Sequence, residues 1–172
     1  MNANSVRFSV NENDFIAAHS YRRFPLGYMP NMEDPDTIYD SQYIYVQAGE
    51  AITAYQPYGV FGQEKIFSID EFTASNMRIA RLVVPQFSMA PGEYGFVTYK
   101  GQCIANVGAG LNAEAQNYIA ASQGITDRLF FQSSFPDEVL SNTFGFLLEA
   151  AAAGTIAHRK ICLLGKDGRI PT

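Results

Sequence analysis

Residues 92–107 read Gly-Glu-Tyr-Gly-Phe-Val-Thr-Tyr-Lys-Gly-Gln-Cys-Ile-Ala-Asn-Val, and this stretch decides the fold. Glycine adopts positive φ without steric strain, so Lys100-Gly101 predicts a two-residue turn between two antiparallel strands. Burial of one face of this hairpin would fix its register, because a slip by one residue turns every side chain over. We therefore expect a sheet nucleus with no catalytic group. Its largely apolar face would carry the facing pairs Thr98 and Cys103, Phe96 and Ala105, and Tyr94 and Val107.

The composition indicates one domain whose surface is partly covered by other molecules. A chain of 172 residues is most simply a single domain. Hydrophobic residues make up 47% and charged residues only 17%, and there are 13 Phe and 10 Tyr. Interfaces are depleted in charge and rich in aromatic residues, so an oligomer or assembly is one interpretation and an ordinary aromatic core is the other. The net charge of −5 argues against binding to nucleic acid.

We predict that residues 1–40 form an extended N-terminal arm and that residues 41–172 form a single β-rich domain. Asn11–His19 can form a short helix capped by Asn11 or Asn13. Four Pro and Gly positions then prevent regular structure, but the aromatic side chains between them are too many for a disordered linker. Such an arm lies on a surface, either its own or a neighbour's. The candidate interface residues are Phe15, Tyr21, Phe24, Leu26, Tyr28 and Met29.

An acidic cluster follows the arm, and it predicts a solvated turn and no metal site. The cluster comprises Glu33, Asp34, Asp36 and Asp40. It lacks the glycine and the terminal bidentate Glu that an EF-hand calcium loop requires.

Further along the chain, alternating apolar residues predict several strands. Residues 42–55 place Tyr43, Tyr45 and Gln47 on one face and Ile44 and Val46 on the other. Residues 65–69 predict a short strand, and Met77–Val84 fits a helical turn or, better, a buried strand. Phe144–Ala150 and Ile156–Leu164 predict a second hairpin whose loop contains Gly154. Phe144, Phe146 and Leu148 would form its apolar face.

A glycine-rich segment raises a dinucleotide-binding alternative. Gly108-Ala-Gly-Leu-Asn-Ala113 matches G-x-G-x-x-A after a strand, and Asn112–Ala121 is a possible helix. No acidic residue ends a second strand at the required distance, and the alternating strand–helix order of such a fold is missing. A glycine turn between sheet elements is the better interpretation, and we expect no cofactor. Ser134–Leu140 predicts a one-turn helix.

Candidate catalytic residues are few. Only His19 and His158 titrate near neutral pH without a large pKa shift. Cys162 lies four residues from His158, roughly 13 Å along one strand, so it cannot pair with it. Cys103 would meet His158 only if the two hairpins pair, and no third orienting group is apparent. We therefore expect no enzyme, and we expect both cysteines to be buried free thiols.

No segment predicts membrane insertion or export. Met1–Val10 is polar and mixed, unlike a signal peptide. No apolar run approaches the ~20 residues that span a bilayer. We expect a soluble protein that is synthesised in the cytoplasm and has no membrane partner.

Residues 92–107, the small-residue turn after them, residues 144–156 and the closing strand together resemble the head decoration (cement) proteins of tailed bacteriophages. The resemblance covers about residues 90–165. It implies a compact antiparallel β-barrel or β-tulip module with short helices. It also implies a homotrimer that sits on the outer surface of the capsid against the major capsid protein, without catalysis or cofactor.

Two rival interpretations accompany the resemblance. The first is a carbohydrate- or host-binding β-module of a virion fibre, in which exposed tyrosines around residues 39–58 form a sugar platform. The second is a small β-barrel enzyme that uses His158 or Asp36 of the acidic cluster.

Overall fold

The computed structural model is mainly β, as the sequence predicts. It describes residues 10–32, 41–61, 64–68, 80–109, 118–122, 125–132, 143–149, 156–165 and 167–168. Its helical element is a short 3-10 turn, η1 (Glu12–Phe15). The strands are β1 (Asn31–Met32), β2 (Ser41–Ala48), β3 (Tyr58–Phe61), β4 (Lys65–Ser68), β5 (Ala80–Val83), β6 (Tyr94–Ala109), β7 (Tyr118–Ser122), β8 (Ile125–Gln132), β9 (Thr143–Leu147), β10 (Ala157–Leu164) and β11 (Asp167–Gly168).

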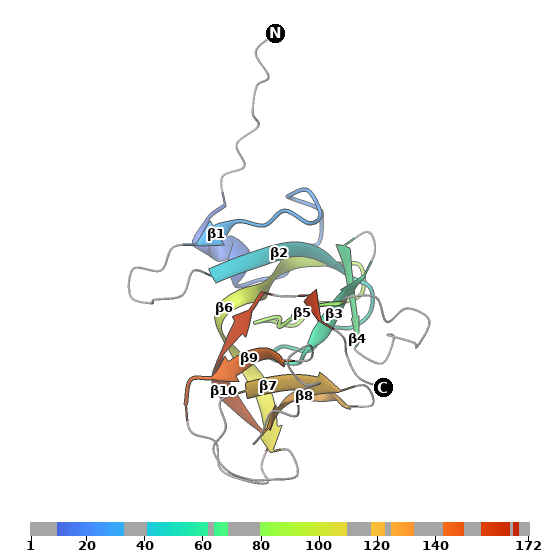
Figure 1. Cartoon of the computed structure of the whole chain (residues 1–172). Coiled ribbons are helices and arrows are strands. Elements are labelled where there is room, and N and C mark those ends of the chain that lie inside the picture. Colours follow the sequence, from blue (N-terminus) through green and yellow to red (C-terminus); the bar gives the residue numbers. More distant parts are fainter. Residues whose placement is uncertain are drawn as a thin grey trace.

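The strands form one curled, mostly antiparallel sheet (Figure 1). Its order is β10-β9-β7-β8-β6-β2-β4-β3-β5-β11, and β1 adds to β2. An additional pairing joins β10 to β6, so β6, β10, β9, β7 and β8 close into a ring. The remaining strands form a half-barrel on the other end of β6. Two pairings, β2 with β4 and β6 with β8, are parallel.

The long strand β6 replaces the predicted Lys100-Gly101 hairpin, so that prediction is wrong. Residues 94–109 run as one strand, whose first half pairs with β2 and whose second half pairs with β10. Gly101 does have a positive φ of 91°, but the register with β2 shifts beside it, between Gln42 and Tyr43. A glycine with positive φ fits a bulge as well as a turn, and here it bends the strand without reversing it.

Two apolar cores lie along β6. Val97 contributes to the half-barrel core, together with Ile44, Val46, Ile66 and Val83. The odd-numbered residues of the second half point into the ring and pack with side chains of β7 to β10. These ring residues are Cys103, Ala105, Val107, Ile119, Leu129, Phe144, Leu147, Ile161 and Leu163. Phe96 packs with side chains of the N-terminal segment and Ala105 packs in the core of the ring, so the two residues do not meet in one apolar face of a hairpin.

The other sequence predictions fare better. In β2, Tyr45 faces away from Ile44 and Val46, which confirms the predicted alternation. Antiparallel pairing of β9 with β10 confirms the second hairpin. Its apolar face was predicted wrongly, since Leu147 is buried and Leu148 is exposed. Glu33 to Asp40, Gly110 to Asn117, Ser134–Leu140 and the loop with Gly154 lie outside the described residues.

Two ambiguous segments resolve as strands where the structure describes them. Residues 80–83 of Met77–Val84 form β5, and residues 118–121 of Asn112–Ala121 belong to β7. In the described part of the chain, no helix is long and apolar enough to cross a membrane.

Candidate functional site

The N-terminal segment, residues 10–32, lies across the ribbon formed by β2 and the first half of β6, and we call it the strap (Figure 1). At its far end it continues the sheet beyond β1, because Tyr45 N donates to the Tyr28 carbonyl (3.0 Å) and Gly27 N donates to the Tyr45 carbonyl (2.8 Å). At its near end, His19 and Tyr94 exchange two backbone hydrogen bonds of 2.7 and 2.9 Å. The strap therefore binds both outer edges of the ribbon.

Aromatic side chains fill the space between strap and ribbon. Phe96 of β6 is at the centre: its ring centroid lies 4.8 Å from that of Phe15, 5.1 Å from Phe24 and 4.9 Å from Tyr45. Phe24 meets Tyr45 edge-on at 5.1 Å. Contacts of this geometry add to the free energy gained by burying the rings. The strap is thus a covering layer of this fold. Of the two predicted positions for the arm, residues 10–32 take the one on the chain's own surface.

A buried polar network lies beside these rings. Asp14, the third residue of η1 after its N-cap Asn11, is fully buried. One carboxylate oxygen accepts from Arg23 Nη1 at 2.5 Å, and the other accepts from the Asn11 backbone N–H at 3.0 Å. The Tyr45 hydroxyl accepts from the Arg23 backbone N–H at 3.1 Å and lies 3.1 Å from His19 Nδ1. The network joins the strap to β2.

The geometry around His19 fits a neutral imidazole. Arg23 Nη1 lies 3.4 Å from His19 Nε2, and because a guanidinium can only donate, Nε2 is the acceptor in this contact. Nδ1 then carries the proton and donates to Tyr45. Burial and the adjacent Arg23 charge lower the pKa of His19, and Asp14 opposes them. Burial likewise raises the pKa of the Tyr45 phenol.

The structure separates the six candidate interface residues. Phe24 is only 5% exposed and belongs to the chain's own core. Phe15, Leu26 and Tyr28 are half-buried against the same aromatic cluster, and Met29 packs against the half-barrel core. Tyr21, in contrast, is 67% exposed. Of the six, Tyr21 alone points its ring mainly into solvent.

Exposed large apolar side chains in the described residues form two groups. On the strap, Ile16 is 69% exposed and accompanies Tyr21, and we call this pair the strap patch. The other group, the sheet patch, lies on the outer face of the ring and comprises Ile104, Leu148, Ile156 and Leu164.

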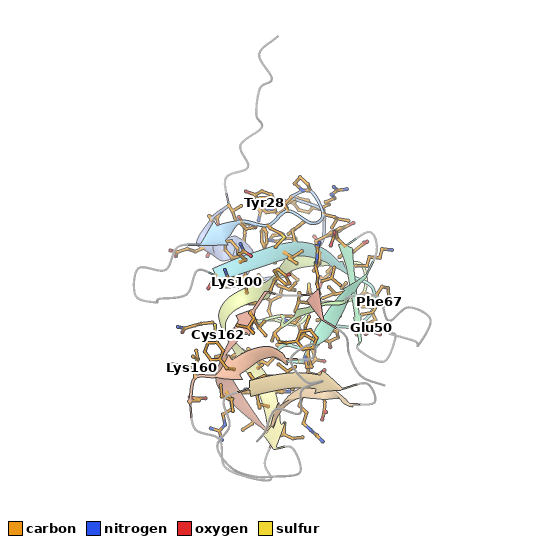
Figure 2. The ribbon with its side chains drawn as sticks, viewed as in Figure 1. Tyr28, Glu50, Phe67, Lys100, Lys160 and Cys162 are labelled. Carbon is orange, nitrogen blue, oxygen red and sulfur yellow. The ribbon has the colours of Figure 1, made fainter. Side chains whose placement is uncertain are left out.

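Strand register brings the sheet patch together. Lys160 of β10 pairs with Ile104 of β6, and on the other edge the Lys160 carbonyl accepts from Leu148 N at 3.0 Å. The three side chains therefore form one row across the sheet. Ile156 and Leu164 share this outer face by strand alternation. Figure 2 shows Lys160 beside β10, the strand that runs through the patch.

A Cys103–His158 pair, which the sequence already disfavours, does not fit this register either. Cys103 pairs with Ile161, and both point into the ring, whereas His158 pairs with Asn106 and is exposed on the outer face. Both cysteines are buried and free, as predicted. Burial raises the pKa of each thiol, so neither forms a thiolate readily. The His158 ring instead contacts Tyr55, with centroids 4.7 Å apart.

The expected tyrosine platform around residues 39–58 is absent from the part of it that the structure describes. Tyr45 and Tyr58 are buried, and Tyr43 is half-buried against Phe15 at 4.6 Å. Across the described residues, no group of three or more His, Cys, Asp or Glu side chains is placed to hold a metal ion.

Sequence reasoning missed the polar network entirely. The capping pair Asn11 and Asp14 was a readable local signal. The meeting of Asp14 with Arg23, and of His19 with Tyr45, depends on the path of the strap across the ribbon and leaves no pattern in the sequence.

Comparisons with known proteins include a structural likeness to a solved phage protein. No protein-family model matches the chain, and no curated protein matches it. Among solved structures, the chain is similar to the N base of the head fiber protein gp8.5 of bacteriophage phi29, with 14% sequence identity and a TM-score of 0.44. The match covers 73% of this chain and 95% of that one.

Proposed function

We propose that the chain is a structural protein of a tailed-bacteriophage virion. In this proposal it attaches as an oligomer, a homotrimer, to the outer surface of the capsid and holds major capsid protein subunits together. Two features support the proposal: the resemblance of residues 92–107 and 144–164 to head decoration proteins, and the exposed apolar surface of the fold.

The observation that carries the proposal is the presence of two separate apolar patches. The strap patch (Ile16 and Tyr21) lies on the segment that covers the first half of β6, and the sheet patch lies on the outer face of the ring that contains the second half. A decoration protein needs two kinds of contact, one to its own copies and one to the shell. Tyrosine is enriched among residues that dominate binding energy, and Arg22, also exposed, lies next to Tyr21.

We assign the strap patch to the capsid and the sheet patch to contacts between copies. The assignment follows the positions of the two surfaces. The strap patch lies on a segment outside the barrel, and both of its side chains are exposed to a large neighbour. The sheet patch includes two side chains of a row across neighbouring strands, Leu148–Lys160–Ile104, and an exposed sheet face can pack against another sheet.

The experiment compares two matched double substitutions. Ile16→Ser with Tyr21→Ser removes the strap patch, and Ile104→Ser with Leu148→Ser removes the sheet patch; all four side chains are exposed, so both variants are expected to fold. Co-sedimentation with purified capsids is expected to weaken by about tenfold or more for the first variant. Mass in solution is expected to fall to that of the monomer for the second. Unchanged capsid binding by both variants would overturn the proposal.

Deletion of residues 1–40 is a poor test of capsid attachment. It would remove Phe24 and expose Tyr45 and Phe96, both fully buried here, so loss of binding would accompany loss of packing. The point substitutions avoid this because they change only exposed side chains.

The fibre-module alternative is distinguished by its ligand. Because Tyr45 and Tyr58 are buried, a sugar platform would need other residues. Binding of the isolated wild-type protein to a glycan array, with no affinity for capsids, would favour the alternative over the decoration role.

A further inference from the structure

We propose that His19 makes the strap a pH-sensitive latch, which is closed at neutral pH and released from the β2–β6 ribbon when His19 takes up a proton. The inference does not depend on the proposed function. It rests on the geometry of the polar network and on the position of the imidazole where the strap pairs with the edge of β6 at Tyr94.

The first step is the fit of the closed strap to a neutral imidazole. Nε2 faces the Arg23 guanidinium at 3.4 Å and Nδ1 faces the Tyr45 hydroxyl at 3.1 Å. That hydroxyl already accepts from the Arg23 backbone N–H. If Nδ1 keeps its proton, a second proton on Nε2 would point an N–H at the Arg23 guanidinium, which is itself a donor. Two cations, the imidazolium and the guanidinium, would then lie side by side.

The second step is the charge around the His19 imidazole. On the strap, Asp14 Oδ1 lies 3.5 Å from Nε2, so it would attract a protonated imidazole. The same oxygen is the acceptor for Arg23, and the second oxygen is used by Asn11. One carboxylate would thus serve two cations in a buried place. The ribbon contributes only phenols: Tyr45 from β2 and Tyr94 from β6, whose rings stack at 6.2 Å.

The third step is the link from the His19 imidazole to the attachment of the strap. His19 itself makes both backbone hydrogen bonds to Tyr94, and its ring packs 6.3 Å from Phe24 and 5.9 Å from Tyr45. Displacement of the His19 imidazole would therefore break the near attachment of the strap. The far attachment at Gly27 and Tyr28 consists of backbone hydrogen bonds to Tyr45, so protonation of a side chain does not break it directly.

The direction of the pH effect follows from proton linkage. In the open strap, His19 has its ordinary pKa of about 6.5, and in the closed strap the pKa is lower. Above pH 6.5 neither state binds the proton, so the latch has its full stability. Below pH 6.5 the open state binds the proton more tightly, and the ratio of open to closed strap rises by up to about tenfold per pH unit until the closed-state pKa is reached.

Amide hydrogen exchange of the full chain at pH 7.5 and pH 5.5, corrected for intrinsic rates, tests the latch. Protection of the His19 and Arg23 amides is expected to fall by several-fold to about tenfold at pH 5.5. Protection of Ile161 to Leu163 in β10 is expected to stay unchanged. Equal protection of the strap at both pH values would overturn the proposal.

The chain has two histidines, and the second supplies a matched control. His19→Gln is expected to abolish the pH dependence, and His158→Gln, at an exposed position, is expected to retain it. Loss of strap protection in His19→Gln with the wild-type pH dependence would also overturn the proposal. If His19→Gln opens the strap at both pH values, NMR titration of wild-type His19 decides. A titration midpoint below the ordinary value of about 6.5 that coincides with strap opening supports the latch, and any other result contradicts it.

Discussion

The two halves of β6 differ in how their side chains are covered. In the first half Phe96 is buried under aromatic side chains of the strap. In the second half the outward face carries Gln102, Ile104 and Asn106, and it is partly or fully open. Inward-facing residues are apolar in both halves. The need for a covering layer therefore depends on the side chains. The large apolar ring of Phe96 requires a second layer, whereas Gln102, Ile104 and Asn106 can remain in contact with solvent.

The covering layer also differs in chemistry from the closed ring. The core of the ring consists of apolar side chains, whereas the junction of strap and ribbon combines aromatic rings with a charged pair and a histidine. Polar networks depend on every partner being in place. We therefore expect the strap to open locally and the ring to open only when the whole fold does.

The strongest way to break the comparison is Phe96→Ala. Phe96 contacts rings from both the strap and β2, and its loss is expected to lower the free energy of unfolding by about 3–5 kcal/mol. Ile104→Ala, at an exposed position in the second half, is expected to lower it by less than about 1 kcal/mol. Urea denaturation measures both values. Equal losses for the two variants would contradict the contrast between the halves.

Gly101→Ala probes the junction between the halves. Gly101 has φ of 91°, a conformation that strains a residue with a Cβ, so a loss of about 1–3 kcal/mol is expected in the same urea assay. Gly108→Ala is the control for the added methyl group, because Gly108 has no positive φ and the nearest atoms to its Cβ would belong to the Arg128 side chain, which has to shift. Wild-type stability of Gly101→Ala would show that the bend is not required.

Asp14→Asn tests the strap alone. The change removes the charge that pairs with Arg23 and is expected to destabilise the closed strap by about 1–2 kcal/mol, since Arg23 is itself partly exposed. Trypsin cleavage after Arg22 and Arg23 is expected to accelerate by about 5- to 30-fold. Glu12→Gln, an exposed acid in the same turn, is expected to leave the rate unchanged. An equal acceleration in Glu12→Gln would contradict a specific role of the pair.

The smallest expected effect concerns the thiols of the ring. Cys103 and Cys162 are buried with raised pKa values, so labelling by Ellman's reagent at pH 8 is expected only on opening of the ring. Asp14→Asn is expected to leave the labelling rate within about twofold of wild type, because local opening of the strap does not expose the ring. A rate that rises together with trypsin cleavage would show that the strap and the ring open as one unit.

Local patterns predicted the parts of this fold that depend on neighbouring residues. The alternation of β2 and the hairpin of β9 with β10 were predicted because side-chain period and hairpin pairing are short-range. Lys100-Gly101 misled the prediction because a turn and a bulge both use a glycine with positive φ. The partner decides between the two outcomes: β10, far along the chain, offers an edge to the second half of β6.

The candidate site was predictable only in composition. Aromatic residues of the strap marked it as a packing segment, but their division into buried Phe24 and exposed Tyr21 depends on which side meets the ribbon. Proline and glycine remove the periodicity that would assign the sides. The pairing of Asp14 with Arg23 is a product of tertiary structure.

The shared strand β6 has a consequence for synthesis on the ribosome. Its first half can pair with β2 as soon as it emerges, but its second half waits for β10, which is translated much later. During this interval a nascent chain presents an unpaired strand edge with the apolar residues of the future ring. Such edges are templates for wrong pairing between chains, so crowded polysomes are the setting in which this protein is most exposed to misassembly.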